Sequence, residues 1–348
     1  MVTLGYLPRH FKTILGKVPR RLCVTYSLPT LAEIEEAARI VYRFMPPTPQ
    51  YCWPGLSSRC DCEVWVKHEN HTPVGAFKIR GGLVYMDNLV QTQQDVQGVV
   101  TATRGNHGQS ITTAARQYGL TSTIIVPEGN SMEKNAAMRT QGAELIEYGH
   151  DFQAAREYAI DYAIKNNLHL ISSLDPLLIH GVSTYAWEFF TAIPDLHTVY
   201  VPIGQGSGIC GMIAARNALG LQTKIVGVVA DTAPAYALSF DAKKPVSTTT
   251  AHTMADGVAC RTPISEAVEI ILKGAERIAR VSENSITDAM HILFTDTHNV
   301  AEGAGAVGLA ALFQDMDKIQ GKKVGFILSG GNVDAGTFKS VLEGSRHA

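Results

Sequence analysis

The sequence has no excess of charge of either sign. Lys and Arg number 30 and Asp and Glu number 32 among 348 residues, so the formal net charge is −2. Without an overall basic field, the chain has no charge with which to hold a nucleic-acid backbone. It also lacks any apolar run that approaches the roughly 20 residues needed to cross a bilayer. The composition therefore excludes a nucleic-acid partner and a membrane span.

Cysteine is scarce. The six residues are Cys23, Cys52, Cys60, Cys62, Cys210 and Cys260. So few cysteines in a chain of this size do not make a disulfide framework, and we expect a reduced, cytoplasmic protein. Residues 1–27 are predicted to form a basic N-terminal arm. Residues 1–32 contain no acid, as in a transit peptide, but the segment lacks the long apolar centre of a secretory signal.

Two of the cysteines, Cys60 and Cys62, stand close to His68 and His71 in a pattern that suggests a metal site. Zinc sites, however, usually use a Cys-x-x-Cys spacing. The alternation along residues 62–67 is typical of a strand, which predicts that the two cysteines share one face. We therefore expect a strand here rather than a zinc site.

Short β-branched runs alternate along the chain with glycine-containing turns and longer amphipathic stretches. Strands are expected at residues 99–103, 123–126, 144–148, 169–172, 199–203, 224–230 and 324–328. Strands that alternate with helices predict a parallel α/β sheet, in which ligands bind where the strands end. Thr30, with Glu33 three residues later, is typical of the start of a helix that runs to Arg43. Residues 240–262 are irregular and polar and are expected to form a surface loop.

A glycine-rich turn follows the strand expected at residues 199–203 and opens a helix. Its residues are Gly204, Gln205, Gly206, Ser207 and Gly208. Glycines let the backbone approach an anion closely, and a helix N-terminus supplies free N–H groups. The turn is not a P-loop, because no Gly-Lys-Ser/Thr follows, and it is a poor dinucleotide fingerprint. A phosphate cradle and a plain strand-to-helix turn both explain it.

Three further segments carry reactive or polar groups. Lys78 follows Phe77 just after a glycine turn, and a buried lysine amine is suited to a Schiff base, although a lysine whose tip reaches solvent explains this position better when it is taken alone. Residues 103–109, Thr-Arg-Gly-Asn-His-Gly-Gln, offer donors to a carboxylate at another helix start. Ser329 ends a strand in Ser-Gly-Gly and is placed to face a ring nitrogen. A capped turn is the alternative for the last two.

Taken together and in this order, these segments resemble fold-type II pyridoxal-phosphate enzymes, the tryptophan synthase β-like superfamily, and within it threonine/serine dehydratases and serine racemase. The resemblance runs from about residue 28 to about residue 335. It implies an α/β fold of two parallel-rich domains with the cofactor in the cleft between them. A large cofactor-binding domain would comprise residues 28–97 and 177–348, and a small substrate domain residues 98–176.

The resemblance also implies a role for each matching residue. Lys78 would be the Schiff-base lysine, Ser329 would face the pyridine nitrogen and Glu302 would lie near the cofactor ring. The residues expected to bind pyridoxal 5'-phosphate are Phe77, Lys78, Asn106, Gly204, Gln205, Gly206, Ser207, Gly208, Glu302 and Ser329. Those expected to bind the substrate are Thr103, Arg104, Gly105, Asn106 and His107.

The implied reaction is loss of water from a hydroxy amino acid, L-threonine or L-serine, which gives a 2-oxo acid and ammonia. The freed Lys78 amine would take the Cα proton. A hydroxyl at Ser329 does not keep a pyridine nitrogen protonated as a carboxylate would, which suits prompt loss of a β-substituent. The alternatives are a 3-hydroxyaspartate dehydratase, a pyridoxal-phosphate-dependent β-replacement synthase and a homologue that binds the cofactor without turnover.

Arg104 departs from the family pattern. Members usually have Ser-Ser-Gly-Asn-His, whereas this chain has Thr-Arg-Gly-Asn-His from Thr103 onward. In serine racemase the second serine is an acid/base, and arginine with its very high pKa is a poor replacement, so racemisation is not expected. Arg104 suits a second carboxylate, as in 3-hydroxyaspartate, because guanidinium pairs with carboxylate bidentately. A structural ion pair is the alternative.

A divalent cation stays an open question. Some relatives bind Mg²⁺ or Ca²⁺ after the strand that follows the glycine loop, through two acids and a carbonyl. Asp231 matches the first acid and Ala235 can supply the carbonyl, but Ala237 stands where the second acid is expected. The resemblance further implies a homodimer or homotetramer. Nothing recognisable follows residue 335, so a regulatory domain and feedback inhibition by isoleucine are not expected.

Overall fold

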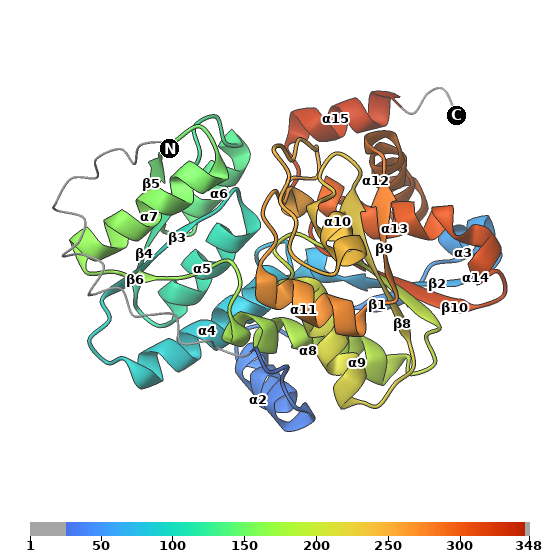
Figure 1. The fold of residues 1–348 in the computed structure, drawn as a ribbon, viewed down its shortest axis with the longest axis horizontal. Coiled ribbons are helices and arrows are strands. Elements are labelled where there is room, and N and C mark those ends of the chain that lie inside the picture. Colours follow the sequence, from blue (N-terminus) through green and yellow to red (C-terminus); the bar gives the residue numbers. More distant parts are fainter. Residues whose placement is uncertain (1–25, 345–348) are drawn as a thin grey trace, which may run out of the picture.

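The computed structural model describes residues 26–344, so the predicted basic arm lies almost wholly outside the described residues. Two sheets organise this part of the chain (Figure 1). One has six strands in the order β1-β2-β10-β7-β8-β9, and the other has four in the order β5-β4-β3-β6. Within these sheets, β1 and β2 pair antiparallel and every other neighbouring pair is parallel. The predicted α/β fold with parallel-rich sheets is confirmed.

The elements have the following bounds. The strands of the six-stranded sheet are β1 (Gln50–Cys52), β2 (Glu63–His68), β7 (Thr198–Pro202), β8 (Lys224–Ala230), β9 (Arg277–Val281) and β10 (Lys323–Leu328). Those of the four-stranded sheet are β3 (Gly98–Ala102), β4 (Thr121–Val126), β5 (Glu144–Glu147) and β6 (His169–Leu170). The α-helices are α2 (Leu31–Tyr42), α3 (Pro54–Cys60), α4 (Lys78–Thr92), α5 (Asn106–Gln117), α6 (Met132–Thr140), α7 (Phe152–Asn166), α8 (Pro176–Ala192), α9 (Ser207–Ala218), α10 (Ala235–Ala242), α11 (Ser265–Gly274), α12 (Glu283–Thr297), α13 (Gly303–Gln314), α14 (Met316–Ile319) and α15 (Ala335–Gly344). Two 3₁₀ turns are η1 (Glu69–His71) and η2 (Asp256–Val258).

All strands expected from the sequence are present, each within two residues of its predicted bounds. They were predictable because strands buried on both faces are continuous β-branched runs, as in β3, where every residue is buried. The sequence did not signal β1 or β9. β1 has only three residues, and β9 carries Arg277 and Arg280, which interrupt its apolar pattern.

The predicted helix start at Thr30 is confirmed. The Thr30 hydroxyl accepts the N–H of Glu33 over 3.4 Å, and the Glu33 carboxylate accepts the N–H of Thr30 over 2.7 Å. These bonds to Thr30 lower the pKa of Glu33. The capping box thus begins α2, which buries Ile34 and Val41 and packs against α8.

Two expectations from the sequence are wrong. Cys60 closes helix α3, and Asp61 then turns the chain with a φ of 47°, so Cys60 and Cys62 do not share a strand face. Residues 240–262 do not form merely a surface loop. The segment includes η2, and its Ala255 and Val258 are buried in the core, because small apolar residues spaced along a polar segment anchor it to the protein.

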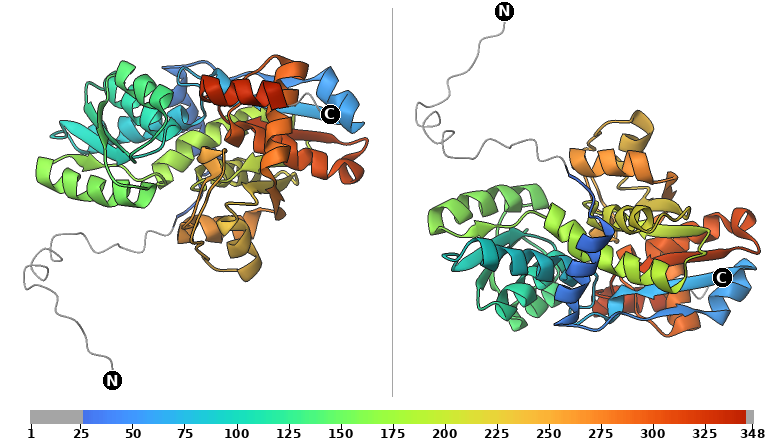
Figure 2. Two further views of the ribbon diagram at one scale, coloured as in Figure 1. Left: turned by 90° about the horizontal axis from the view of Figure 1, so that it is seen from above. Right: turned by 90° about the horizontal axis from the view of Figure 1, so that it is seen from below.

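The two sheets lie side by side, and helices join them. Figures 1 and 2 show the four-stranded sheet with α5, α6 and α7 in one half of the molecule and the six-stranded sheet in the other. Helix α4 packs against α5 and α8, and α8 packs against α9. None of the helices between residues 26 and 344 has both the length and the apolar character that a membrane crossing needs. The domain limits at residues 97/98 and 176/177 stay a prediction.

Candidate active site

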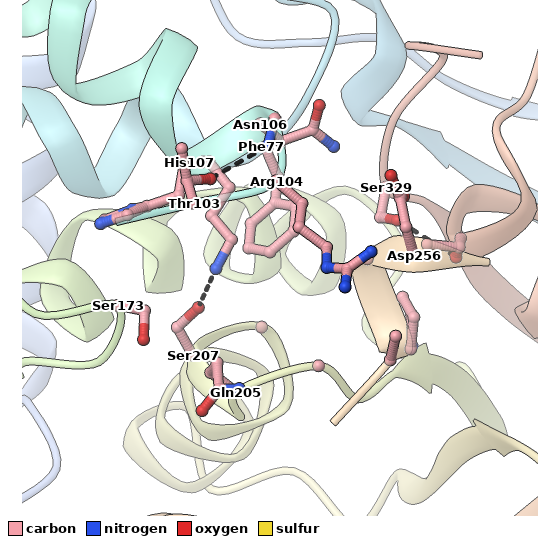
Figure 3. Close-up of a pocket in the computed structure, with 18 of the residues that line it drawn as sticks. Phe77, Thr103, Arg104, Asn106, His107, Ser173, Gln205, Ser207, Asp256 and Ser329 are labelled. Carbon is pink, nitrogen blue, oxygen red and sulfur yellow. Dashed lines mark hydrogen bonds between the residues drawn. The ribbon is translucent and has the colours of Figure 1, made fainter. Parts of the chain in front are cut away.

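A pocket of about 130 Å³ lies where strands of both sheets end (Figure 3). Carboxyl ends of parallel strands are the usual ligand sites of α/β sheets. Ala102 at the end of β3, Pro202 at the end of β7 and Ser329 after β10 all line it. The pocket brings together all the residues singled out from the sequence for cofactor or substrate. These are Phe77, Lys78, Thr103, Arg104, Gly105, Asn106, His107, Gly204, Gln205, Gly206, Ser207, Gly208, Glu302 and Ser329.

Lys78 is the first residue of α4 and reaches into the pocket. Gly75 turns the preceding chain with a φ of 66°, and the N–H of Phe77 donates to the carbonyl of Ser329 over 3.1 Å. Lys78 Nζ donates to Ser207 Oγ over 3.2 Å (Figure 3). The surrounding protein desolvates the ammonium ion and lowers the pKa of Lys78 from 10.5 to about 8. Lys78 is therefore half-buried, and its amine lies in the pocket against Ser207 instead of extending freely into bulk solvent.

The glycine-rich turn joins β7 to α9. Gly206 has a φ of 105°, in the left-handed region that favours glycine. The N–H of Cys210 donates to the carbonyl of Gly206 over 3.0 Å, and a helix start leaves the amides before such a bond without intrahelical partners. The Tyr236 hydroxyl donates to the carbonyl of Gln205 over 2.9 Å and fixes the turn. The turn thus presents an anion-binding helix end beside Lys78.

Thr103 and His107 shape the start of α5. Thr103 Oγ1 accepts the N–H groups of Gly105 and Gly108, over 3.0 and 3.4 Å. Burial, with a smaller effect from the Lys78 charge, lowers the pKa of His107 to about 3. The imidazole is therefore neutral near pH 7, and its buried Nε2 has no hydrogen-bond partner among the described residues. His107 can therefore contact a ligand, but the neutral imidazole does not act as a general acid.

Asn106 connects the two halves of the molecule. Its Nδ2 donates to Glu302 Oε1 over 2.6 Å, and its Oδ1 accepts from Asn332 Nδ2 over 2.8 Å. Glu302 is 3% exposed. Burial raises the pKa of Glu302 to about 7, although the charge of Lys134 opposes this shift. Near neutral pH, Glu302 therefore populates both protonation states.

Ser329 is buried at the end of β10. Its Oγ donates to the carbonyl of Ala304 over 3.3 Å, a long bond that leaves the hydroxyl free to reorient. A hydroxyl is an uncharged donor and acceptor. The residue therefore offers the pocket a neutral hydrogen-bonding group where a strand ends.

The sequence did not signal two charged residues of the pocket, Lys134 and Asp256. Lys134 lies on α6 and donates to Asp256 Oδ2 over 2.5 Å across the cleft, with Glu302 Oε2 at 3.8 Å. Burial alone lowers the pKa of Lys134, but the two carboxylates outweigh it and raise the pKa. In the sequence, a lysine on an amphipathic helix and an aspartate in an irregular loop are typical of surface residues. Only the fold brings the two together in the pocket.

Arg104 directs its guanidinium into the pocket (Figure 3). The residue is exposed. It forms no ion pair with another residue of the described chain, so the structural ion pair considered from the sequence is not found. Its charge therefore faces the space that a ligand would enter.

The residues considered for a metal ion include Asp231 and Ala235, near β8 and α10, and Cys60 in α3. Asp231 follows β8 and is exposed, and the carbonyl of Ala235 accepts the Ser239 hydroxyl over 2.7 Å. Burial raises the pKa of Cys60 to about 12, which disfavours a thiolate ligand. Within residues 26–344, no group of three or more His, Cys, Asp and Glu side chains is placed to hold a metal ion.

A lysine amine of lowered pKa lies beside a helix N-terminus at the ends of parallel strands, an arrangement that suits an enzyme holding a phosphorylated aldehyde cofactor. The comparison with protein families agrees, since residues 41–330 match the family described as pyridoxal-phosphate dependent enzyme. The chain belongs to this family, in its fold-type II branch. Its cofactor is pyridoxal phosphate, and the resemblance inferred from the sequence is confirmed.

Individual relatives cover most of the chain. It is 32% identical to the L-threonine ammonia-lyase of Thermotoga maritima over 90% of its own length and 78% of the relative's. It is 29% identical to the L-threo-3-hydroxyaspartate ammonia-lyase of Saccharomyces cerevisiae over 91% of its length and 97% of that protein's. The solved structure of maize serine racemase superposes with a TM-score of 0.85 at 25% identity and covers 91% of this chain and 98% of that one.

Proposed function

We propose that this enzyme removes water from a hydroxy amino acid, L-threonine or L-serine, and releases a 2-oxo acid and ammonia. The observation that carries the proposal is the Lys78 amine, which has a pKa lowered to about 8 and lies 3.2 Å from Ser207 of the glycine-rich turn. The Thermotoga relative, named an L-threonine ammonia-lyase, supports this choice of substrate. The water lost between Cα and Cβ is regained when the C–N bond hydrolyses, so the net products are one 2-oxo acid and one ammonia.

The residues of the pocket fit pyridoxal phosphate. Two buried polar atoms, His107 Nε2 and Glu302 Oε2, have no hydrogen-bond partner among the described residues, as expected where a ligand completes a site. Lys78 would hold the aldehyde carbon, the turn at Gly206 would hold the phosphate and Ser329 would face the ring nitrogen. When bound, this cofactor withdraws electrons from Cα of an attached amino acid and weakens the bonds to that carbon.

Lys78 serves as the base in this proposal. An amine accepts a proton only in its neutral form. With a pKa of about 8, roughly a tenth of the amine is neutral at pH 7, a few hundred times more than for a lysine of ordinary pKa. Lys78 Nζ is therefore suited to take the proton from Cα, whereas a solvent-exposed lysine is not.

Ser329 and Arg104 favour elimination over racemisation. A carboxylate would keep a proton on a ring nitrogen, but the Ser329 hydroxyl has no charge with which to do so, and weak electron withdrawal favours prompt departure of the β-hydroxyl. Arginine stays protonated at every physiological pH, so Arg104 does not return a proton to Cα. The amides at the start of α5, after Thr103, are suited to hold the substrate carboxylate.

The release of 2-oxo acid by the purified holoenzyme tests the proposal. The panel comprises L- and D-threonine, L- and D-serine, the 3-hydroxyaspartates and O-acetylserine, with Lys78→Ala as the inactive control. We expect 2-oxobutyrate from L-threonine and pyruvate from L-serine. Release from neither, by a protein whose absorbance shows bound cofactor, would refute the assignment.

A second candidate is 3-hydroxyaspartate dehydration, with oxaloacetate and ammonia as products. The observation that favours it is the Arg104 guanidinium, which faces the pocket without a carboxylate partner. The Saccharomyces relative, named an L-threo-3-hydroxyaspartate ammonia-lyase, supports it. We expect Arg104→Ser to shift the preference toward threonine, and an unchanged ratio of kcat/KM for the two substrates would contradict this role.

We further propose that the enzyme acts in the cytoplasm as a homodimer or homotetramer. The five described cysteines are free thiols, and four of them are buried, which suits a reducing compartment. Light scattering on the eluate of a size-exclusion column tests the assembly, and a mass of 37.6 kDa, that of one chain, would contradict it.

A further inference from the structure

A second cavity, of about 520 Å³, opens beside the active-site pocket and is called here the vestibule. The two cavities share Arg104, Phe152, Ser173, Gln205 and Ala259, so they adjoin each other. One wall comes from residues 150–156 at the start of α7, in the half with the four-stranded sheet. The other comes from residues 249–252 and 259–266, before and at the start of α11. The vestibule therefore exists only where both halves of the molecule meet.

Cationic side chains outnumber carboxylates in the vestibule by one. Its arginines are Arg104, Arg156 and Arg261, its carboxylates are Asp151 and Glu266, and its histidines are His150 and His252. The whole chain, by contrast, has a net charge of −2. The lining contains both signs with an excess of one positive charge, and such an excess favours anionic ligands.

One of the three vestibule arginines has an acidic partner among the described residues. Asp151 lies 3.6 Å from Arg261, and it also caps α7 by accepting the N–H of Ala154 over 2.8 Å. That backbone bond is the main cause of the lowered pKa of Asp151. Arg104, Arg156 and the carboxylate of Glu266 form no ion pair within residues 26–344. Two guanidinium groups and one carboxylate therefore line the cavity without an ion pair.

The sizes of the two cavities indicate where a ligand's charge would lie. The pocket around Lys78, of about 130 Å³, would hold the cofactor together with the reacting atoms of the substrate, and the larger vestibule begins at Arg104. A side chain that leaves Cβ toward the vestibule would bring its end to the arginines. Guanidinium binds carboxylate bidentately, which gives it both affinity and a preferred orientation.

We propose that the vestibule is an anion subsite, and that it extends the substrates of the enzyme to 3-hydroxy amino acids whose side chains end in a second carboxylate. Arg104 binds the shorter member, 3-hydroxyaspartate, at the boundary. Arg156 and Arg261 extend the site to the longer 3-hydroxyglutamate, whose dehydration and deamination give 2-oxoglutarate and ammonia. This inference rests on the proposed function, because it places the dehydration at Lys78.

The test compares kcat/KM for L-threonine, 3-hydroxyaspartate and 3-hydroxyglutamate in the holoenzyme. We expect Arg156→Gln and Arg261→Gln each to lower the ratio of kcat/KM for 3-hydroxyglutamate to that for threonine at least tenfold, mainly through KM. The matched control is Arg116→Gln, an exposed arginine at the far end of α5 that lines neither cavity. Ratios that follow the control would overturn the proposal.

A binding measurement separates failure of the subsite from failure of the reaction. Succinate and glutarate carry two carboxylates and no hydroxyl, and calorimetry on the holoenzyme measures their affinity without turnover. We expect binding to weaken at least fivefold in Arg156→Gln and Arg261→Gln, while acetate shows no difference between variants. Equal binding by all variants would overturn the subsite, and intact binding without 2-oxo acid from any substrate would refute only the proposed reaction.

Discussion

Two groups of charged residues in the molecule, one buried and one at an open cavity, are built in opposite ways. One, called here the buried cluster, comprises Lys67, Glu69, Arg80 and Glu188. Of these, Arg80 lies on α4, two residues after Lys78. The other comprises the vestibule arginines, Arg104, Arg156 and Arg261. The buried cluster contains two cations and two carboxylates, whereas the vestibule contains more cations than carboxylates.

The buried cluster is fully paired. Arg80 donates to Glu69 over 2.7 Å and to Glu188 over 2.6 Å, and Lys67 donates to Glu188 over 2.6 Å. Arg80, Lys67 and Glu69 have no exposed surface. Removing charges from water costs several kcal/mol per ion, so a cluster this deep persists only when every charge is matched. The cluster holds the first turn of α4, and with it the position of Lys78.

The two groups show that the burial of a charged residue decides whether it positions a helix or remains able to bind a ligand. Matched charges in the interior position a helix and have no capacity left for a ligand. Unmatched charges at an open cavity are hydrated when it is empty, so they carry no large folding penalty and can bind an anion. The neutral buried cluster thus positions α4, and the vestibule, with its excess of one cation, can select a ligand.

The largest effect is expected when one cation is removed from the buried cluster. Arg80→Met would leave Glu69 and Glu188 buried with only Lys67 as a cation, and we expect the free energy of unfolding to fall by about 3–5 kcal/mol. Urea unfolding of the holoenzyme measures this. The control Arg39→Met removes a pair with Glu36 that is mostly exposed, and it should change the free energy by less than about 1 kcal/mol. Similar losses in the two variants would contradict the argument.

A double-mutant cycle on Lys67 and Glu188 tests whether the buried cluster acts as a unit. Because these residues share a hydrogen bond of 2.6 Å and the same network, we expect a coupling of about 0.5–3 kcal/mol between Lys67→Met and Glu188→Gln. The vestibule pair Arg156→Gln and Arg104→Gln should show coupling near zero in the same unfolding assay. Additive losses at Lys67 and Glu188 would mean that the cluster does not act as a unit.

Glu302 lies between these two extremes, because it is buried yet incompletely paired. Its pKa is raised from 4.5 to about 7, so the folded state binds more protons than the unfolded state between these values. The free energy of unfolding should therefore fall as pH rises from about 4.5 to about 7. Glu302→Gln removes this titration, and its stability should vary less over that window. Parallel pH profiles for both proteins would contradict the assignment.

The smallest expected effect comes from salt. The Debye length falls from about 10 Å at 0.1 M to about 3 Å at 1 M, and exposed charges are screened more than buried ones. Raising NaCl over this range should lower kcat/KM for 3-hydroxyaspartate several-fold relative to threonine. The stabilising effect of Arg80, measured against Arg80→Met in urea, should change little. A larger salt effect on Arg80 than on the substrate ratio would reverse the comparison.

Much of the site was predictable because its residues occur in short local motifs. The glycine-rich turn, the segment with Lys78, the turn from Thr103 to His107 and Ser329 each follow a strand or open a helix. Motif order led to the family, and the structure brings the motifs to one pocket. The resemblance implied that Asn106 and Glu302 each lie near the cofactor, but their hydrogen bond, between residues 196 apart, was not predicted, because no local pattern indicates it.

Other features had no local signal. Lys134 and Asp256 lie 122 residues apart and looked like surface residues, and the loop around Asp256 looked like an ordinary polar segment. The buried cluster draws on β2, η1, α4 and α8, and each of its residues appears as an isolated charge along the chain. Burial is a property of the packed molecule, so an exposed and a buried lysine look the same in a sequence.

The sequence by itself determined the strand–helix alternation, the capping box at Thr30 and the identity of the motifs that lead to a pyridoxal-phosphate enzyme. These follow from backbone preferences and hydrophobic periodicity within a few residues. Only the tertiary structure decided which charges are paired, that the amine of Lys78 has a pKa of about 8 and that Arg104 faces a shared cavity unpaired. The physical reason is that desolvation and Coulomb energies depend on distances between groups that are remote in sequence.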